Sequence, residues 1–222
     1  MKRQEAQYHV FIALYAASLA CVALYIISAV YYGASPFWFL NWNLVLAWLP
    51  LAFAVMLKSH LKTGRWSSWQ GICLTLLWLV FLPNSFYLIS DLVHLDFARY
   101  SQTFYYVIML FSFSFAGLLL GFTSLYVVHQ ELLKRLKHNT AHLWVGAVLL
   151  VCSFAVYLGR YLRWNTWDIL LHPVGLVFDV SDRVINPVAY GQTFQVTAMF
   201  FILLASMYFT LWHLAQALHK SK

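Results

Sequence analysis

The sequence predicts an all-α membrane protein in which six transmembrane helices form a bundle, with both termini in the cytoplasm. Hydrophobic residues make up 63% of the 222 residues. Only 9% are charged, whereas a soluble domain would carry about 25%. Six apolar stretches of roughly 20 residues are each long enough to cross a bilayer as a helix. No linker or low-complexity segment separates them, so we expect one integral-membrane domain over residues 1–222.

The predicted spans are, in chain order, residues 9–32, 37–57, 69–90, 102–128, 142–162 and 192–216. The first follows a charged start, as a signal peptide would. Its apolar run continues from Val10 to about Ala34, which is too long for a signal peptide and favours an uncleaved span. In the fourth span, Gly117 and Gly121 form a Gly-x-x-x-Gly step. This step favours close packing within the chain over a dimer contact.

The long connection after the fifth span is the least regular part of the sequence. Its first half, ILLHPVGLVF, is apolar and is expected to lie in the membrane interface or to dip back into the membrane. Its second half, FDVSDRVINP at 178–187, carries three charges and is expected to form an exposed loop.

Lys and Arg residues set the predicted orientation, because cytoplasmic loops are enriched in them. Ten of the 14 basic residues fall on one side of a six-span bundle: Lys2, Arg3, Lys58, Lys62, Arg65, Lys134, Arg135, Lys137, Lys220 and Lys222. Topology thus explains the net charge of +7, and we expect membrane lipids as partners and no nucleic acid. His129 and His142, near the same boundary, are interpreted as interfacial residues.

A stripe of polar residues ends the third span. Asn84, Tyr87, Asp91 and His94 are spaced by three, four and three residues, so they share one face if the helix continues past Pro83. We expect this face to point inward or toward a vestibule at the extracytoplasmic side. Asn41 and Asn43 of the second span face the same vestibule or only bridge helices.

A second polar cluster follows the fifth span and reaches the same membrane surface. Arg160, Arg163 and Asp168 share a broad face if the helix continues, and Asn165 lies among them. Two arginines on the extracytoplasmic side are exceptions to the positive-inside rule, which suggests that they have a specific role. They suit a phosphate or a carboxylate ligand, or they pair with Asp91 and Asp168 and hold the third and fifth spans together.

These two clusters resemble the signature blocks of a bacterial integral-membrane family known as domain of unknown function 1361. Its first block reads Pro-Asn-x-x-Tyr-x-x-x-Asp-x-x-His-Leu, and its second reads Gly-Arg-x-x-Arg-x-Asn-(Ser or Thr)-Trp-Asp. The matching residues are Pro83, Asn84, Tyr87, Asp91, His94, Leu95, Gly159, Arg160, Arg163, Asn165, Thr166, Trp167 and Asp168. The resemblance covers roughly residues 40 to 215. It carries no established activity, so it supports the site and not a reaction.

Several roles are open for the acidic and imidazole groups. Asp91, His94 and Asp168 are candidates for proton transfer or for ligands of a divalent metal, which is the one cofactor considered. His172 could complete such a metal site, although it lies outside the family block. Asp91 and His94 could also be a hydrogen-bonded pair at a helix end. Asn84, Tyr87, Arg160, Arg163 and Asn165 are the candidate substrate contacts.

Three functions from different classes are consistent with this pattern. The first is a protein of the bacterial inner membrane that binds or acts on an anionic lipid or a lipid-linked envelope precursor at the extracytoplasmic face. The second is a structural or accessory subunit of a cell-envelope complex. The third is a small transporter or flippase. Two observations argue against it: no charged residue falls at mid-membrane depth, and no inverted repeat is apparent. Whether the protein is an enzyme stays open.

Overall fold

The computed structural model of the protein describes residues 2–32, 37–97 and 103–220. All regular structure in these ranges is helical. Six helices are long and apolar enough to cross a membrane, which confirms the predicted spans. They are α1 (Lys2–Tyr32), α2 (Phe39–His60), α3 (Trp69–Ser90), α4 (Thr103–Leu133), α5 (His138–Tyr161) and α8 (Gly191–Lys220).

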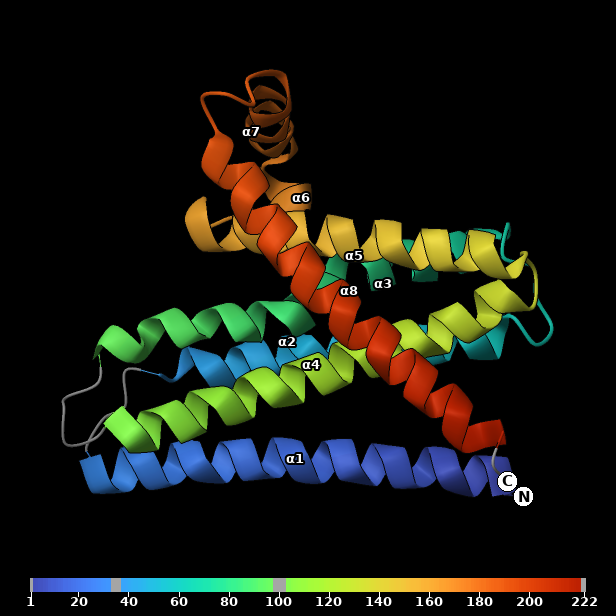
Figure 1. Cartoon of the computed structure of the whole chain (residues 1–222), viewed down its shortest axis with the longest axis horizontal. Helices are drawn as coiled ribbons and strands as arrows, with labels where there is room; N and C mark the ends of the chain where they lie inside the picture. Colours follow the sequence, from blue (N-terminus) through green and yellow to red (C-terminus); the bar gives the residue numbers. More distant parts are fainter. Residues whose placement is uncertain (1, 33–36, 98–102, 221–222) are drawn as a thin grey trace.

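Five of these helices run along the long axis of the molecule, and α8 crosses them obliquely (Figure 1). The start of α1 and the end of α8 lie at the same end of the bundle, as an even number of spans requires. Helix α3 is central, because it packs against α2, α4 and α5. Helix α1 packs mainly on α4.

Side-chain hydroxyl groups fix the central helix in place. Ser85 of α3 donates a hydrogen bond to the Ala47 carbonyl of α2 at 2.9 Å. Ser114 of α4 donates to the Leu88 carbonyl of α3 at 2.9 Å. These bonds satisfy hydroxyl groups that would otherwise be buried in hydrocarbon at a cost.

The Gly-x-x-x-Gly step lies against α3, as expected for packing within the chain. A Cβ atom at Gly117 would come within 2.5 Å of the Ser85 carbonyl oxygen. One at Gly121 would come within 2.6 Å of the Phe86 ring. Only glycine allows α4 to approach α3 this closely.

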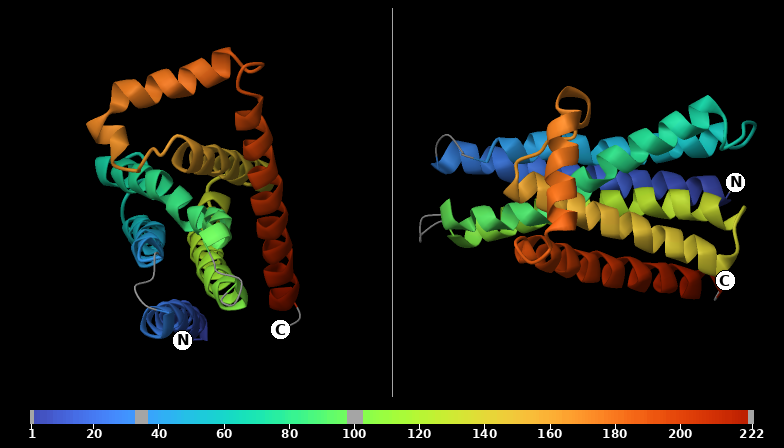
Figure 2. Two further views of the ribbon diagram at one scale, coloured as in Figure 1. Left: turned by 90° about the vertical axis from the view of Figure 1, so that its left-hand side faces the viewer. Right: turned by 90° about the horizontal axis from the view of Figure 1, so that it is seen from above.

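The connection between α5 and α8 differs from the expected loop. It contains the short α-helix α6 (Asp168–Leu171) and the longer α-helix α7 (Pro173–Ile185), so the prediction of a loop at 178–187 was wrong for residues up to 185. Pro173 occupies the first turn, where its missing N–H costs nothing. Helix α7 crosses the direction of the bundle and lies beside it, between its two ends (Figure 2). The charged residues fit a helix because they are confined to one face, whereas the other face is apolar.

The interfacial interpretation of His129 was also wrong, since this residue is fully buried. Its Nδ1 lies 2.9 Å from the Tyr208 hydroxyl and its Nε2 lies 3.2 Å from His142 Nδ1. The Trp212 ring lies against it, with ring centroids 4.1 Å apart. Side chains of α8 cover this histidine, and no local pattern in the sequence indicates that α8 crosses here.

Candidate functional site

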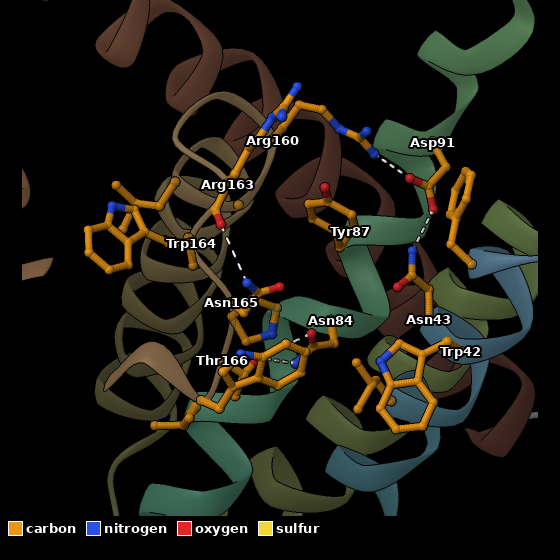
Figure 3. A pocket seen from close by; sticks show the side chains of 18 of the residues that line it. Trp42, Asn43, Asn84, Tyr87, Asp91, Arg160, Arg163, Trp164, Asn165 and Thr166 are labelled. Carbon is orange, nitrogen blue, oxygen red and sulfur yellow. Dashed lines mark hydrogen bonds and ion pairs between the residues drawn. The ribbon is translucent and has the colours of Figure 1, made fainter. Parts of the chain in front are cut away.

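The two polar clusters meet in one pocket of about 680 Å³ between α2, α3, α5 and the segment that follows α5. It lies toward the end of the bundle opposite the chain termini. Seven of the eight candidate site residues line it: Asn84, Tyr87, Asp91, His94, Arg160, Arg163 and Asn165. Figure 3 labels all of these except His94 and shows that they come from different elements and surround one space. The eighth, Asp168, is not part of the lining.

Helix α3 positions the first cluster as the spacing predicted. The helix continues through Pro83 to Ser90, and the 3₁₀ helix η1 (Asp91–Phe97) follows directly. The polar stripe therefore stays on one face across the junction, and Tyr87, Asp91 and His94 all reach the pocket.

Asp91 is the most buried charged residue of the site, with 1% of its surface exposed. Its Oδ2 atom accepts a hydrogen bond from Asn43 Nδ2 of α2 at 3.0 Å. Its Oδ1 atom accepts one from Arg160 Nη2 of α5 and forms an ion pair with it. One carboxylate thus joins three helices, and both of its oxygens are engaged.

The guanidinium group of Arg160 contacts residues at the junction of α3 and η1. Its Nε and Nη2 atoms donate to Ser90 Oγ at 3.0 and 2.8 Å. Its Nη1 atom lies 3.0 Å from His94 Nε2. The guanidinium carbon lies 4.6 Å from the centre of the Tyr87 ring, a cation–π distance. Figure 3 shows the side chain reaching from α5 over Tyr87 to Asp91.

The same contact fixes the tautomer of His94. A guanidinium group only donates hydrogen bonds, so His94 Nε2 must accept. The neutral ring then carries its proton on Nδ1. His94 Nε2 is 4.0 Å from Asp91 Oδ1, beyond hydrogen-bond distance, so the two residues do not form the base–carboxylate pair that their spacing suggested.

Arg163 differs from Arg160 in both backbone and partners. Helix α5 ends at Tyr161, so the expected continuous face from Arg160 to Asp168 was wrong. Arg163 has φ 59°, in the left-handed region that usually takes glycine and costs other residues roughly 1–2 kcal/mol. Its side chain is exposed in the pocket lining and makes no ion pair with any carboxylate in the described part of the chain.

The segment after α5 is tied back to α3 by a reciprocal pair of hydrogen bonds. Asn84 Nδ2 donates to Thr166 Oγ1 at 2.9 Å, and Thr166 Oγ1 lies 3.2 Å from Asn84 Oδ1. The two family blocks are therefore in direct contact.

Asp168 caps its own turn. Its Oδ2 atom accepts from the backbone N–H of Asn165 at 2.7 Å and from Asn165 Nδ2 at 3.2 Å. In the described part of the chain Asp168 forms no ion pair with Arg160 or Arg163, which was one of the expected pairings, and it does not line the pocket. Within residues 2–32, 37–97 and 103–220, no three His, Cys, Asp or Glu side chains lie close enough to hold a metal ion. Asp91, His94 and Asp168 do not form such a group.

Two contributors to the site were not recognised from the sequence. Ser90 accepts two hydrogen bonds from Arg160, although its position three residues after Tyr87 could have placed it on the stripe. Gly159 lets α5 approach α3, because a Cβ atom there would come within 2.9 Å of the Tyr87 ring. The sequence placed Asn41 and Asn43 either in the vestibule or between helices; Asn43 lines this pocket and also bridges α2 to Asp91, whereas Asn41 is not part of the lining.

The charges that line the pocket do not balance. Asp91 contributes one carboxylate, and Arg160 and Arg163 contribute two guanidinium groups. Asp91 neutralises Arg160, so Arg163 leaves the lining with an uncompensated positive charge. This arrangement suits an anionic group near Arg163.

Comparison with known proteins adds a family assignment. The family model described as "Protein of unknown function (DUF1361)" matches residues 42–212. The match includes all residues of both polar clusters and leaves out α1. No curated protein and no solved structure matches the chain.

Proposed function

Because the chain belongs to the DUF1361 family, whose description names no activity, we propose its function from the site itself: the pocket binds the headgroup of an anionic lipid or a lipid-linked envelope precursor. In this proposal the pocket faces the extracytoplasmic side of a bacterial inner membrane, since the basic residues gather at the other end of the bundle. Arg163 is the anion-binding residue.

The observation that carries the proposal is the contrast between the two arginines. Arg160 has a carboxylate, a hydroxyl, an imidazole and an aromatic ring as partners, which is the pattern of a structural group. Among the described residues Arg163 has none of these partners, and it occupies a backbone conformation that disfavours arginine. A structural role accounts for Arg160 but leaves Arg163 unexplained. Strained backbone at a pocket is typical of functional positions.

The same geometry supports binding more than catalysis. Both oxygens of Asp91 and the Nε2 atom of His94 are engaged by neighbouring donors. A general base must lie within hydrogen-bond reach of the proton that it removes, whereas these atoms already accept hydrogen bonds from the protein. Tyr87 and Asn165 line the pocket with Arg163 and are the further candidates for headgroup contacts.

The test is to replace Arg163 by glycine and by lysine in the full chain, purified in nanodiscs of a neutral lipid with added phosphatidic acid. Glycine removes the guanidinium and also suits the left-handed backbone. We expect Arg163→Gly to keep or raise the melting temperature and to weaken phosphatidic acid binding by about tenfold to a hundredfold, the range for charge-assisted hydrogen bonds. Arg163→Lys keeps the charge but loses the forked donor, so it should bind at an intermediate level.

Arg65 provides the matched control, because it is an exposed arginine at the opposite end of the bundle. Arg65→Gln removes the same net charge and should leave binding unchanged. Unchanged phosphatidic acid binding in a well-folded Arg163→Gly protein would contradict the proposed function.

A further inference from the structure

The deep end of the pocket is apolar on each of three helices, whereas its charged residues lie nearer the end of the bundle. On α3 and the start of η1, the lining extends from Asp91 to Val80, a distance of roughly 16 Å at 1.5 Å per residue. On α5 it extends from Arg160 to Ala155, and on α2 from Phe39 to Leu46, with Asn43 between them. In each case the deepest lining residue is apolar. A soluble anion would use only the polar end.

The rim of the pocket is apolar as well. Trp42 on α2 is 50% exposed, and on the opposite rim Trp167 and Ile169 are 43% and 40% exposed. Helices α2 and α5 pack on α3 and hardly touch each other, so the pocket lies in the gap between them. An apolar rim is suited to hydrocarbon chains and not to water.

Helix α7 continues this apolar surface beside the pocket. Its exposed residues include Val174, Val177 and Phe178, each more than half exposed. The other face is held to the site by a hydrogen bond from Trp164 Nε1 to Asp179 Oδ2 at 2.8 Å. An amphipathic helix with such a face lies in the lipid leaflet. Leu176 of this helix lines the pocket, so the cavity and the leaflet are adjacent.

We propose that the ligand of this pocket is an amphiphile whose anionic group lies at Arg163 and whose hydrocarbon chain occupies the deep end formed by Leu46, Val80 and Ala155. The inference rests on the proposed function, because it assigns the rest of the molecule that carries the anion. It identifies the ligand as a lipid of the leaflet and not as a free phosphate or a soluble phosphate ester.

The hydrocarbon chain of the ligand should make a measurable contribution to the binding affinity. Each buried methylene group strengthens binding by roughly fourfold. A series of phosphate monoesters with lengthening chains should therefore bind with increasing affinity until the deep end is filled. A soluble ester such as glycerol phosphate, which has only the headgroup, should bind weakly.

The experiment measures binding of glycerol phosphate and of ethyl, butyl, hexyl and octyl phosphate to the full chain in neutral detergent, by titration calorimetry below the concentrations at which the esters form micelles. The wild-type protein should show affinities that rise along the series. Ala155→Trp fills the deep end, so it should abolish the rise while glycerol phosphate still binds within about twofold of wild type, a change well below that of one lost charged contact. Leu150→Trp adds the same ring to an exposed position of α5 outside the pocket and should behave as wild type.

The outcomes separate the two proposals. Equal affinity along the series in the wild-type protein, with Arg163→Gly still weakening binding, would overturn the amphiphile inference and leave the anion site in place. The inference would also be overturned if Ala155→Trp keeps a normal melting temperature and its affinity still rises with ester length. The hydrocarbon chain of the ester would then bind elsewhere. If no ester and no phosphatidic acid binds to the wild-type protein, the proposed function itself fails. The ester affinities of the wild-type protein test the amphiphile inference without any variant, so the test still works if the Ala155→Trp protein folds poorly.

Discussion

Arg160 and Asp91 form an ion pair that joins the end of α5 to the junction of α3 and η1. Their side chains are 17% and 2% exposed, so the pair is largely removed from solvent. Removing one partner would leave an uncompensated charge in the interior, which typically costs about 3–5 kcal/mol. The pair is therefore one of the contacts that hold the two polar clusters together, beside the Asn84–Thr166 hydrogen bonds.

The first prediction concerns this pair. Arg160→Gln should lower the melting temperature strongly, because Asp91 is left buried and charged without its cation. Asp91→Asn in the same chain should restore much of the loss, since both charges are then gone. Thermal unfolding in detergent measures both variants. Arg163→Gln is the matched control and should leave the melting temperature nearly unchanged. Equal losses in Arg160→Gln and Arg163→Gln would show that the two arginines do not differ as we describe.

The second prediction concerns the close approach of α5 to α3. Gly159→Ala places a methyl group within 2.9 Å of the Tyr87 ring, so the ring and the Arg160 guanidinium above it must move. We expect a loss of about 1–3 kcal/mol in stability, as for other overpacked positions. Phosphatidic acid binding should weaken with it, because Tyr87 lines the pocket.

Gly146 supplies the control for this substitution, because it lies on the same helix and a Cβ atom there meets nothing within 4 Å. Gly146→Ala should leave stability unchanged or raise it by up to about 1 kcal/mol, the difference in helix propensity. If Gly159→Ala is as well tolerated as Gly146→Ala, glycine is not what allows the two blocks to meet.

The third prediction concerns the link between Asn84 and Thr166. Thr166→Val keeps the shape of the side chain but removes the hydroxyl that bonds to Asn84. The segment after α5 should then exchange its backbone hydrogens faster, while α3 and α4 should not change. Hydrogen–deuterium exchange read out by mass spectrometry tests this. Thr166→Ser keeps the hydroxyl and should match wild type, and the hypothesis fails if serine and valine behave alike.

The fourth prediction is the orientation in the membrane. Single cysteines at Val188, which is 98% exposed in the connection between α7 and α8, and at Lys137, between α4 and α5, report on the two sides of the membrane, in a chain whose native cysteines are replaced by alanine. A reagent that does not cross the membrane should label position 188 and not position 137 in intact cells. The reverse pattern would place the pocket on the cytoplasmic side and would remove the extracytoplasmic part of the proposed function.

The sequence by itself determined the spans and the location of the site. Long apolar runs can bury their backbone polar groups in a bilayer only as helices, so composition and length sufficed to predict six of them. The helical period placed Asn84, Tyr87, Asp91 and His94 on one face, and an even number of spans carried Arg160 and Arg163 to the same end of the bundle. These are local properties, which a single chain reveals without knowledge of its packing.

Only the tertiary structure decided what each polar group does. The sequence presented Arg160 and Arg163 as equivalent arginines one turn apart, but α5 ends between them, and the left-handed backbone at Arg163 directs the two side chains to different surroundings. Asp91 then has Arg160 and Asn43 as its partners, and Asp168 bonds to Asn165. Pairing of charges depends on distances between helices that are far apart in the chain. Those distances follow from how closely the helices pack, at positions such as Gly159, and the spacing of residues along one helix does not contain them.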